Sequence, residues 1–154
     1  MRPIIKRHMR WLMNLWPPFL ATGIRVTKLN PEWTEIDVEM KLRFWNTNFV
    51  GTHYGGSLYS MTDPFYMLML IENLGPDYTV WDKSANIRFR KPGVGRVFAS
   101  FRLSERQIDE ICTSLKDQPK VEPTFLVEVK DDSGTVIAEV QKILHVRRTA
   151  AFDG

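Results

Sequence analysis

An apolar stretch at residues 56–74, GSLYSMTDPFYMLMLIENL, restricts the fold of this chain more than any other feature. As a helix it has apolar side chains on every side, and Gly75-Pro76 forms a helix stop directly after it. A helix without a polar face must be covered by other parts of the chain. The remaining sequence therefore has to supply a layer that encloses this helix.

Strand-like segments occur on both sides of the helix. Residues 33–44, WTEIDVEMKLRF, alternate between apolar and charged side chains, and a shorter strand is predicted at residues 23–30, with Asn30-Pro31 as the turn between them. Further strands are predicted at residues 84–91, 95–103, 124–130 and 135–147. Most of them alternate, which indicates one solvated sheet face. We predict an α+β fold in which an antiparallel sheet of about five to six strands wraps a long central apolar helix.

Length and composition indicate a single domain. The chain has 154 residues and is 44% hydrophobic, which suffices for a core without disulfide or metal cross-links. We predict one domain at residues 23–148, preceded by a helical segment at 1–22 and followed by a frayed tail at 149–154. Residues 104–120 are predicted to contain a polar helix with Ser104 as its N-cap.

The first 22 residues are typical of an amphipathic helix. Arg7, Arg10 and Asn14 interrupt the apolar residues and Pro17-Pro18 ends them, so neither a signal peptide nor a membrane-spanning helix is predicted. We favour a helix docked on the domain, and the alternatives are a membrane-surface anchor or a lid over an acyl site. The apolar positions at helical spacing are Ile5, Met9, Leu12, Met13 and Trp16.

Charge and cysteine content narrow the class of protein. The net charge of +3 is spread over interspersed basic and acidic residues, so no nucleic-acid partner is indicated and an anionic small molecule is sufficient. Cys112 is the only cysteine and has no internal disulfide partner, which favours a reducing, cytoplasmic location.

Asp63 is the only ionisable residue of the apolar helix before Glu72. An unpaired buried carboxylate costs several kcal/mol, about 2–7 kcal/mol for a polar group alone, so its presence needs a reason. One interpretation is a general base or nucleophile that lines a cleft; the other is an Asp satisfied by nearby backbone. Pro64 bends the helix or restarts it, and after a restart Asp63 would be only an N-cap. The residues by themselves favour neither interpretation.

Gly55 and Gly56 lie where the chain enters the helix. Free backbone N–H groups there are suited to receive an oxyanion, although a Gly-Gly pair also simply relieves a tight turn. His53 has no companion histidines or cysteines at metal-ligand spacing, and no metal site is predicted. Nucleotide-binding and hydrolase-elbow signatures are missing from the sequence as well.

These residues resemble the motif of the hotdog-fold acyl-CoA thioesterases, particularly the phenylacetyl-CoA-type branch. That motif is an Asn, then His-Gly-Gly, then an Asp on the central helix, and Asn48, Gly55-Gly56 and Asp63 match it in spacing. Residues 85–100, ANIRFRKPGVGRVFAS, resemble the strand, Pro-Gly turn and strand that follow the helix in this fold. The sequence around Asp63 is also similar to that of an uncharacterised bacterial thioesterase-like branch. Tyr54 stands where the motif has its His, and Pro64 is a second departure.

The resemblance implies hydrolysis of acyl thioesters. The carbonyl would bind backbone N–H groups of Tyr54, Gly55 or Gly56, Asn48 would orient water or substrate, and Asp63 would activate water or attack the carbonyl itself. The acid commonly comes from a neighbouring subunit in such proteins, so a homodimer or a dimer of dimers is expected. No cofactor is expected beyond a coenzyme A or acyl-carrier thioester as substrate. The predicted substrate-binding residues are His53, Ser57, Arg88, Arg90 and Lys91, although the three basic residues are more typical of a solvated strand face.

Two other functions fit the same residues. A hotdog dehydratase or hydratase acts on acyl thioesters and uses an imidazole paired with an acid. His53 would have to supply the imidazole, but it lies one position before the motif's His position. A non-catalytic acyl-binding protein is the other, because a fold does not determine a function.

Overall fold

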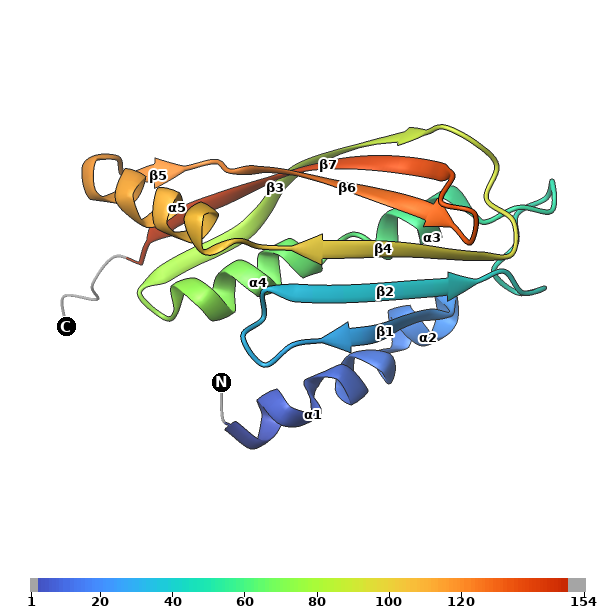
Figure 1. Cartoon of the computed structure of the whole chain (residues 1–154), viewed down its shortest axis with the longest axis horizontal. Coiled ribbons are helices and arrows are strands. Elements are labelled where there is room, and N and C mark those ends of the chain that lie inside the picture. The colour runs from blue at the N-terminus through green and yellow to red at the C-terminus, as the bar shows by residue number, and fades with distance from the viewer. Residues whose placement is uncertain (1–2, 150–154) are drawn as a thin grey trace.

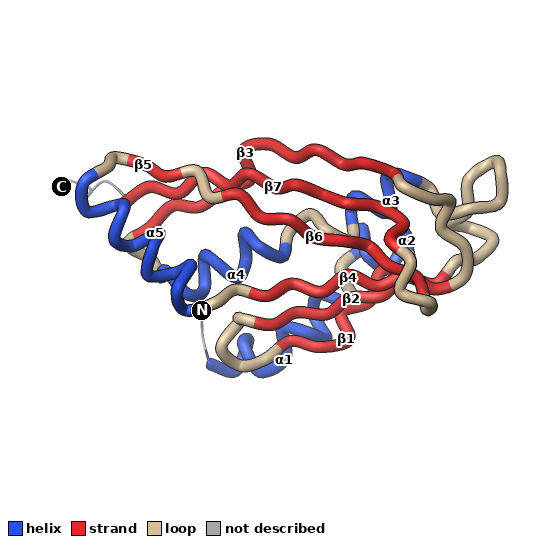
Figure 2. The backbone as a smooth tube through the Cα atoms, turned by 45° about the horizontal axis from the view of Figure 1, so that its top comes forward, coloured by secondary structure: helices blue, strands red, loops and turns tan. Residues whose placement is uncertain are grey.

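The computed structural model describes residues 3–149, with side chains from residue 8 onward. Seven strands form one antiparallel sheet in the order β1-β2-β4-β6-β7-β3, and the short β5 also pairs with β7. The sheet curls around two consecutive helices, α3 and α4 (Figures 1 and 2). The strands are β1 (Ile24–Leu29), β2 (Glu35–Lys41), β3 (Tyr78–Phe89), β4 (Arg96–Arg102), β5 (Lys120–Val121), β6 (Thr124–Asp131) and β7 (Val136–Arg148).

The enclosed helix is interrupted. The predicted helix at residues 56–74 consists of α3 (Gly55–Ser60) and α4 (Phe65–Leu74), and the four residues between them form a turn. Pro64 explains the break, because it has no N–H to donate and its ring crowds the preceding helical turn. Met61, Phe65, Met69 and Leu70 are fully buried against the sheet. The prediction of an enclosed apolar segment is confirmed, and of the two effects expected of Pro64, a bend or a restart, the structure shows the restart.

Alternation directs one face of the central strands into the core. In β2 the buried residues are Ile36, Val38 and Met40, and β4 pairs with it so that Met40 faces Val97 and Val38 faces Ala99. The same alternation continues in β6 and β7, whose inward residues complete the core around α4. The antiparallel arrangement agrees with the prediction, although the sheet has seven strands rather than five to six.

The main differences from the predicted strands are two boundaries and one additional strand. The edge strand β3 begins at Tyr78, six residues before the predicted start, and β5 was not predicted. The predicted strand at residues 33–44 ends at Lys41, because the Asn46 side chain accepts from Arg43 N at 2.7 Å and donates to Lys41 O at 3.0 Å. These bonds turn the chain out of the sheet. The predicted polar helix is α5 (Glu105–Asp117), which Ser104 caps as expected.

The N-terminal segment forms two helices, α1 (Pro3–Asn14) and α2 (Pro17–Thr22), rather than one. Asn14 attaches α1 to the edge strand β1, because its side chain donates to Val26 O at 3.1 Å and accepts from Val26 N at 2.7 Å. This pair of bonds replaces the strand partner that Val26 lacks on that side. Met13 of α1 and Phe19 of α2 are buried in the core. The predicted frayed tail lies, apart from Thr149, outside the described residues.

Across residues 3–149, no helix combines the length and the hydrophobicity that a membrane-spanning segment requires.

Candidate functional site

The turn between α3 and α4 presents one carboxylate. Thr62 closes the turn, since its N–H and its hydroxyl both donate to Tyr59 O at 2.8 Å. The residue before α4 is Pro64, and no side chain caps that helix. Asp63 is therefore not an N-cap, and its side chain is 44% exposed.

A completely buried lysine lies beneath this carboxylate. Lys142 comes from the inward face of β7, between Val140 and Leu144, and its side chain is 0% exposed. Its Nζ donates to Asp63 Oδ1 at 3.0 Å. The Asp82 Oδ1 of β3 is also 3.0 Å from Nζ but lies outside hydrogen-bonding geometry, so that contact is purely ionic. Asp63 thus has a partner that its sequence neighbours did not indicate.

The pKa values of Lys142 and Asp82 are both shifted in this cluster. Burial opposes the charge of Lys142, but the two carboxylates outweigh it and hold its pKa above the usual value. Burial raises the pKa of Asp82, and the attraction of Lys142 reverses this only in part. The Tyr59 ring lies 5.4 Å from Nζ, and burial together with the nearby Asp63 raises the pKa of its hydroxyl. With Lys142 charged and both acids ionised, the cluster keeps one net negative charge.

A separate cleft of about 570 Å³ opens at the other end of α3. It brings together five of the predicted site residues, namely Asn48, His53, Gly55, Arg90 and Lys91, and is also lined by Phe89, Pro92 and Gly93. A Cβ on Gly55 would lie 3.0 Å from the Phe89 ring, and one on Gly93 would lie 2.9 Å from Ile137. The cleft therefore depends on both glycines for its shape.

His53 lies in the wall of this cleft and is almost completely buried. Its Nε2 is 3.1 Å from Gly95 O, and because a carbonyl only accepts, Nε2 carries the proton in this contact. Burial lowers the pKa of His53 more than the bond to Gly95 raises it, which favours the neutral ring. Its Nδ1 is buried without a hydrogen-bond partner among the described residues. The ring therefore retains one free acceptor.

Asn48 organises the loop that leads to α3. Its Oδ1 accepts from the N–H groups of Val50 and Thr52, both at 3.0 Å, and its Nδ2 donates to Thr52 Oγ1 at 2.8 Å and to His53 O at 3.3 Å. These four contacts occupy the whole amide. Asn48 is consequently built into the wall of the cleft and holds the backbone of His53 in place.

The first turn of α3 provides two unpaired donors. Tyr54 is exposed, and its N–H points to Asn46 O at 3.4 Å. Among residues 3–149, no acceptor lies within hydrogen-bonding distance of the N–H groups of Gly55 and Gly56. Ser57 is buried, and its N–H donates back to Tyr54 O at 3.0 Å. Gly55 and Gly56 are thus better donors to a ligand than Tyr54.

The predicted basic residues differ in their surroundings. Arg90 forms an ion pair with Glu139 at 2.7 Å, which raises the pKa of the guanidinium. Lys91 lines the cleft beside it. Arg88 is exposed on β3 and does not line the cleft. An anionic substrate group at the cleft therefore meets Lys91 directly and Arg90 in competition with Glu139.

One chain does not bring the acid and the donors together. Gly55 and Ser60, the first and last residues of α3, are about 7.5 Å apart at the helical rise per residue, and Asp63 lies in the turn beyond Ser60. It does not line the cleft that contains Gly55 and His53. A single carbonyl group therefore cannot contact both halves within one copy.

The sequence reasoning missed Lys142 and Asp82. The alternation of residues 135–147 contained the signal for Lys142, because Val140, Lys142 and Leu144 share one face and the outer two are clearly apolar. A lysine at a core position requires a buried acid as partner. Asp82 was missed because the strand was predicted to begin after it. Among the described residues, no three His, Cys, Asp or Glu side chains are grouped so as to hold a metal ion.

Comparison with known proteins identifies the family and the fold. The family model described as "Domain of unknown function (DUF4442)" matches residues 6–146. A search of curated proteins finds no match.

Solved structures resemble the chain over nearly its whole length. A protein of unknown function from Pseudomonas aeruginosa, named "Probable Thioesterase", has a TM-score of 0.79 at 21% identity and covers 97% of both chains. A thioesterase from Haemophilus influenzae has a TM-score of 0.68 at 13% identity, covering 96% of this chain and 94% of its own. A protein of unknown function from Chlorobaculum tepidum has a TM-score of 0.73 at 12% identity, covering 94% and 95%. At these identities the likeness establishes a shared fold.

Proposed function

Because this chain belongs to the DUF4442 family and has a thioesterase-like hotdog fold, we propose that it hydrolyses acyl thioesters of coenzyme A or of an acyl-carrier arm. One observation carries the proposal: a half-exposed carboxylate, Asp63, is held in a single orientation by a completely buried lysine. Burial of an ammonium group costs several kcal/mol, whereas an ion pair at the surface that only stabilises the fold does not need a buried ammonium. The roles follow the phenylacetyl-CoA-type pattern, in which this position supplies the acid.

The proposed reaction needs a base, an oxyanion site and a leaving group. Lys142 occupies Oδ1 of Asp63, which leaves Oδ2 to accept a proton from water. The resulting hydroxide attacks the thioester carbonyl, and the N–H groups of Gly55 and Gly56 stabilise the oxyanion. Collapse breaks the C–S bond, and the thiolate takes up the proton, which yields a carboxylic acid and a thiol. Direct attack by Asp63 would instead form a mixed anhydride that water then cleaves.

The proposal requires a second copy of the chain, because the acid and the donors of one copy lie too far apart. The edge strand β3 is suited to contact such a copy. Most of its residues from Lys83 to Phe89 are exposed, and an exposed strand of this length is a template for pairing. Val50, which lines the cleft, and its neighbour Phe49 are also largely solvent-exposed in one chain. A homodimer that covers β3 and these two residues would place Asp63 of one copy near the cleft of the other.

Hydrolysis of a panel of acyl-CoA substrates by the wild type and by Asp63→Asn tests the proposal. Release of free thiol should fall by about 10²–10⁴-fold in the variant, the range for loss of a general base. Asp109→Asn, an exposed acid on α5, is the matched control and should hydrolyse at the wild-type rate. Equal, negligible rates in wild type and Asp63→Asn would eliminate the thioesterase proposal.

Complementation tests the shared site. Asp63→Asn and Gly55→Ala are each expected to be inactive, the second because its methyl group crowds Phe89 and fills the cleft. Co-refolding equal amounts should restore about a quarter of the wild-type activity, since half of the dimers are mixed and each has one intact site. Activity no greater than that of the separate variants would show that the two halves do not act across subunits.

A hydratase acting on acyl thioesters is the second candidate, favoured by the free Nδ1 of His53 in the cleft wall. Hydration of crotonyl-CoA distinguishes it from the first. Loss of hydration in His53→Ala, together with normal thioester hydrolysis in Asp63→Asn, would select the hydratase. Binding of acyl-CoA without turnover of any substrate would instead indicate an acyl-binding protein.

A further inference from the structure

The corner formed by α1 and α2 exposes an unusual group of large apolar side chains. Trp11 is 60% exposed and Leu15 is 65% exposed. Among residues 8–22 of this segment, whose side chains are described, only Met13 and Phe19 are buried in the core. Exposed single apolar residues are ordinary, but a contiguous set with two tryptophans marks a contact surface. This set, the apolar strip, consists of Trp11, Leu12, Leu15, Trp16 and Leu20.

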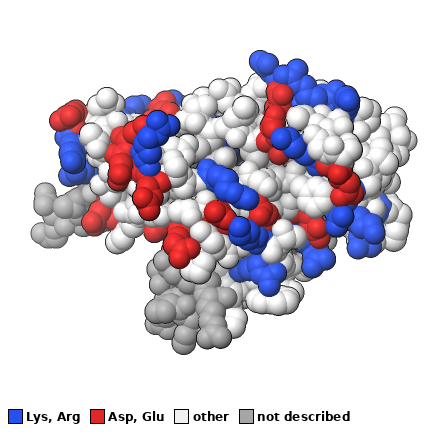
Figure 3. Space-filling model, viewed as in Figure 1, with Lys and Arg blue, Asp and Glu red and all other residues white. Residues whose placement is uncertain are grey.

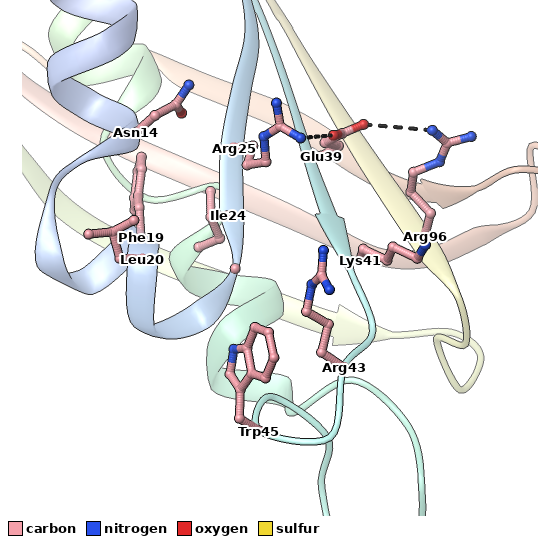
Figure 4. A pocket seen from close by; sticks show the side chains of 11 residues that line it. Asn14, Phe19, Leu20, Ile24, Arg25, Glu39, Lys41, Arg43, Trp45 and Arg96 are labelled. Carbon is pink, nitrogen blue, oxygen red and sulfur yellow. Dashed lines mark ion pairs between the residues drawn. The ribbon is translucent and has the colours of Figure 1, made fainter.

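A basic groove lies directly beside the apolar strip. It has a volume of about 680 Å³ and runs from Leu20 of α2 across the ends of β1 and β2 to the loop after β2 (Figure 4). Four cations line it, namely Arg25, Lys41, Arg43 and Arg96, against a single acid, Glu39. Figure 3 shows basic and acidic side chains interspersed over the face of the molecule seen in Figure 1.

Two of the four cations of the groove have acid partners in the protein. Glu39 is 3.6 Å from Arg25 and 3.9 Å from Arg96, so it forms only loose pairs with both, and Arg96 also pairs with Asp132 at 3.0 Å. Lys41 and Arg43 have no carboxylate within 4 Å among the described residues. The Arg43 guanidinium lies 5.2 Å from the centre of the Trp45 ring, which holds it at the groove rather than in free solvent (Figure 4). The groove therefore presents a fixed positive charge to whatever approaches the corner.

We propose that the apolar strip and the basic groove together bind an anionic phospholipid membrane surface. The tryptophans and leucines would enter the region between headgroups and acyl chains, where Trp is favoured, and the groove would receive lipid phosphates. In sequence, six basic residues and no acid precede Glu32, so the charge of the whole segment complements an anionic surface. An apolar cleft of about 400 Å³ between α1 and α4, lined by Leu12, Trp16, Met67 and Leu68 among others, provides space for part of an acyl chain.

A second copy of the chain fits the same corner poorly. A twofold contact would bring the two grooves and the two acid-free segments together, and like charges at close range oppose association. An anionic bilayer presents the opposite charge over the full extent of the corner. The proposal goes beyond thioester hydrolysis and does not depend on it.

Co-sedimentation with vesicles tests the proposal. Wild type should bind vesicles of phosphatidylcholine and phosphatidylglycerol in about a 2:1 ratio, and binding should weaken with added salt, because exposed charges are screened. Vesicles of phosphatidylcholine alone should bind at least tenfold more weakly. Asp63→Asn should bind as the wild type does, which separates this result from the fate of the proposed enzyme activity.

Two double variants divide the surface into its parts. Trp11→Ser with Leu15→Ser should lower vesicle binding at least tenfold, whereas Leu126→Ser, which changes a 63% exposed leucine on β6, should not change it. Lys41→Gln with Arg43→Gln should lower binding to the anionic vesicles by about fivefold for each cation removed. Lys116→Gln on α5 is the control for charge alone.

Four outcomes would overturn the proposal. The first is no binding to the mixed vesicles, and the second is equal binding by wild type and both double variants. The third is a wild-type oligomer that dissociates in the Trp11, Leu15 double variant without vesicle binding, which would assign the strip to a contact between copies. The fourth is stabilisation by inorganic phosphate, lost in the Lys41, Arg43 double variant, without vesicle binding, which would make the groove a site for free phosphate groups.

Discussion

Replacement of Lys142 by Met removes one buried charge and leaves two carboxylates facing an apolar side chain. Loss of one partner of a fully buried ion pair costs about 3–5 kcal/mol. Asp63 is 44% exposed and Asp82 is 26% exposed, so water can hydrate both in part. We therefore expect a loss of about 2–3 kcal/mol in the free energy of unfolding. For a chain of this length this corresponds to a decrease of about 4–12 °C in Tm.

Urea unfolding measured by tryptophan fluorescence and far-UV circular dichroism gives this free energy directly. The double variant Lys142→Met, Asp82→Asn should be more stable than Lys142→Met alone by about 1 kcal/mol or more, because it also removes the carboxylate left buried. Lys116→Met, on the exposed side of α5, should stay within about 0.5 kcal/mol of the wild type. A Lys142→Met protein as stable as this control would refute the reasoning, as would a double variant whose loss equals the sum of the single losses.

The pH dependence gives an independent check on the same cluster. The pKa of Lys142 is raised above the usual 10.5, so the folded protein binds its proton more tightly than the unfolded chain. The resulting stability is fully present below pH 10.5 and is lost as the pH rises above that value. The difference in free energy of unfolding between wild type and Lys142→Met should therefore narrow in alkaline solution. A difference that stays constant above pH 10.5 would contradict a charged lysine in the folded state.

Three further changes test other parts of the structure. Burial raises the pKa of Asp82 above 3.8, so ionisation of this group lowers the stability of the folded protein as the pH rises from there. Asp82→Asn lacks this ionisation. Its free energy of unfolding in urea should therefore increase relative to that of the wild type between acid and neutral pH. Asn14→Ala loses both bonds to Val26 and should lower the free energy of unfolding by about 1–3 kcal/mol, whereas Asn14→Asp keeps the acceptor and should lose less. Gly93→Ala places a methyl group 2.9 Å from Ile137, and thermal unfolding should show a loss of about 1–3 kcal/mol.

Most of the fold could be predicted because its signals are local. The alternation at residues 33–44 reports burial on one side of a strand, and the Ser104 cap marks the start of α5 within a few residues. Boundaries were less accurate where tertiary contacts act. Asn46 turns the chain away from β2 through bonds to residues on both sides of the turn, and no periodicity encodes that. The early start of β3 depends on its pairing with β7.

The site could be predicted only in part. Five of the predicted residues line one cleft, because they lie within two short segments that the Gly93 turn and the entry to α3 bring together. Asp63 was recognised from its isolation in an apolar run. Its roles as base or nucleophile, and those of Gly55 and Gly56 as donors, stay predictions, as does the cytoplasmic location inferred from the single cysteine.

The sequence by itself determined that an apolar helical segment must be enclosed by alternating strands and that this segment carries one acid, since burial and periodicity are properties of neighbouring residues. Only the tertiary structure decided what the acid contacts. Lys142 contacts Asp63 because the sheet curls over the turn before α4, and Asp82 contacts Lys142 because of the register in which β3 pairs with β7. Such contacts between distant segments depend on how all the strands pack at once, and no local pattern of residues contains that information.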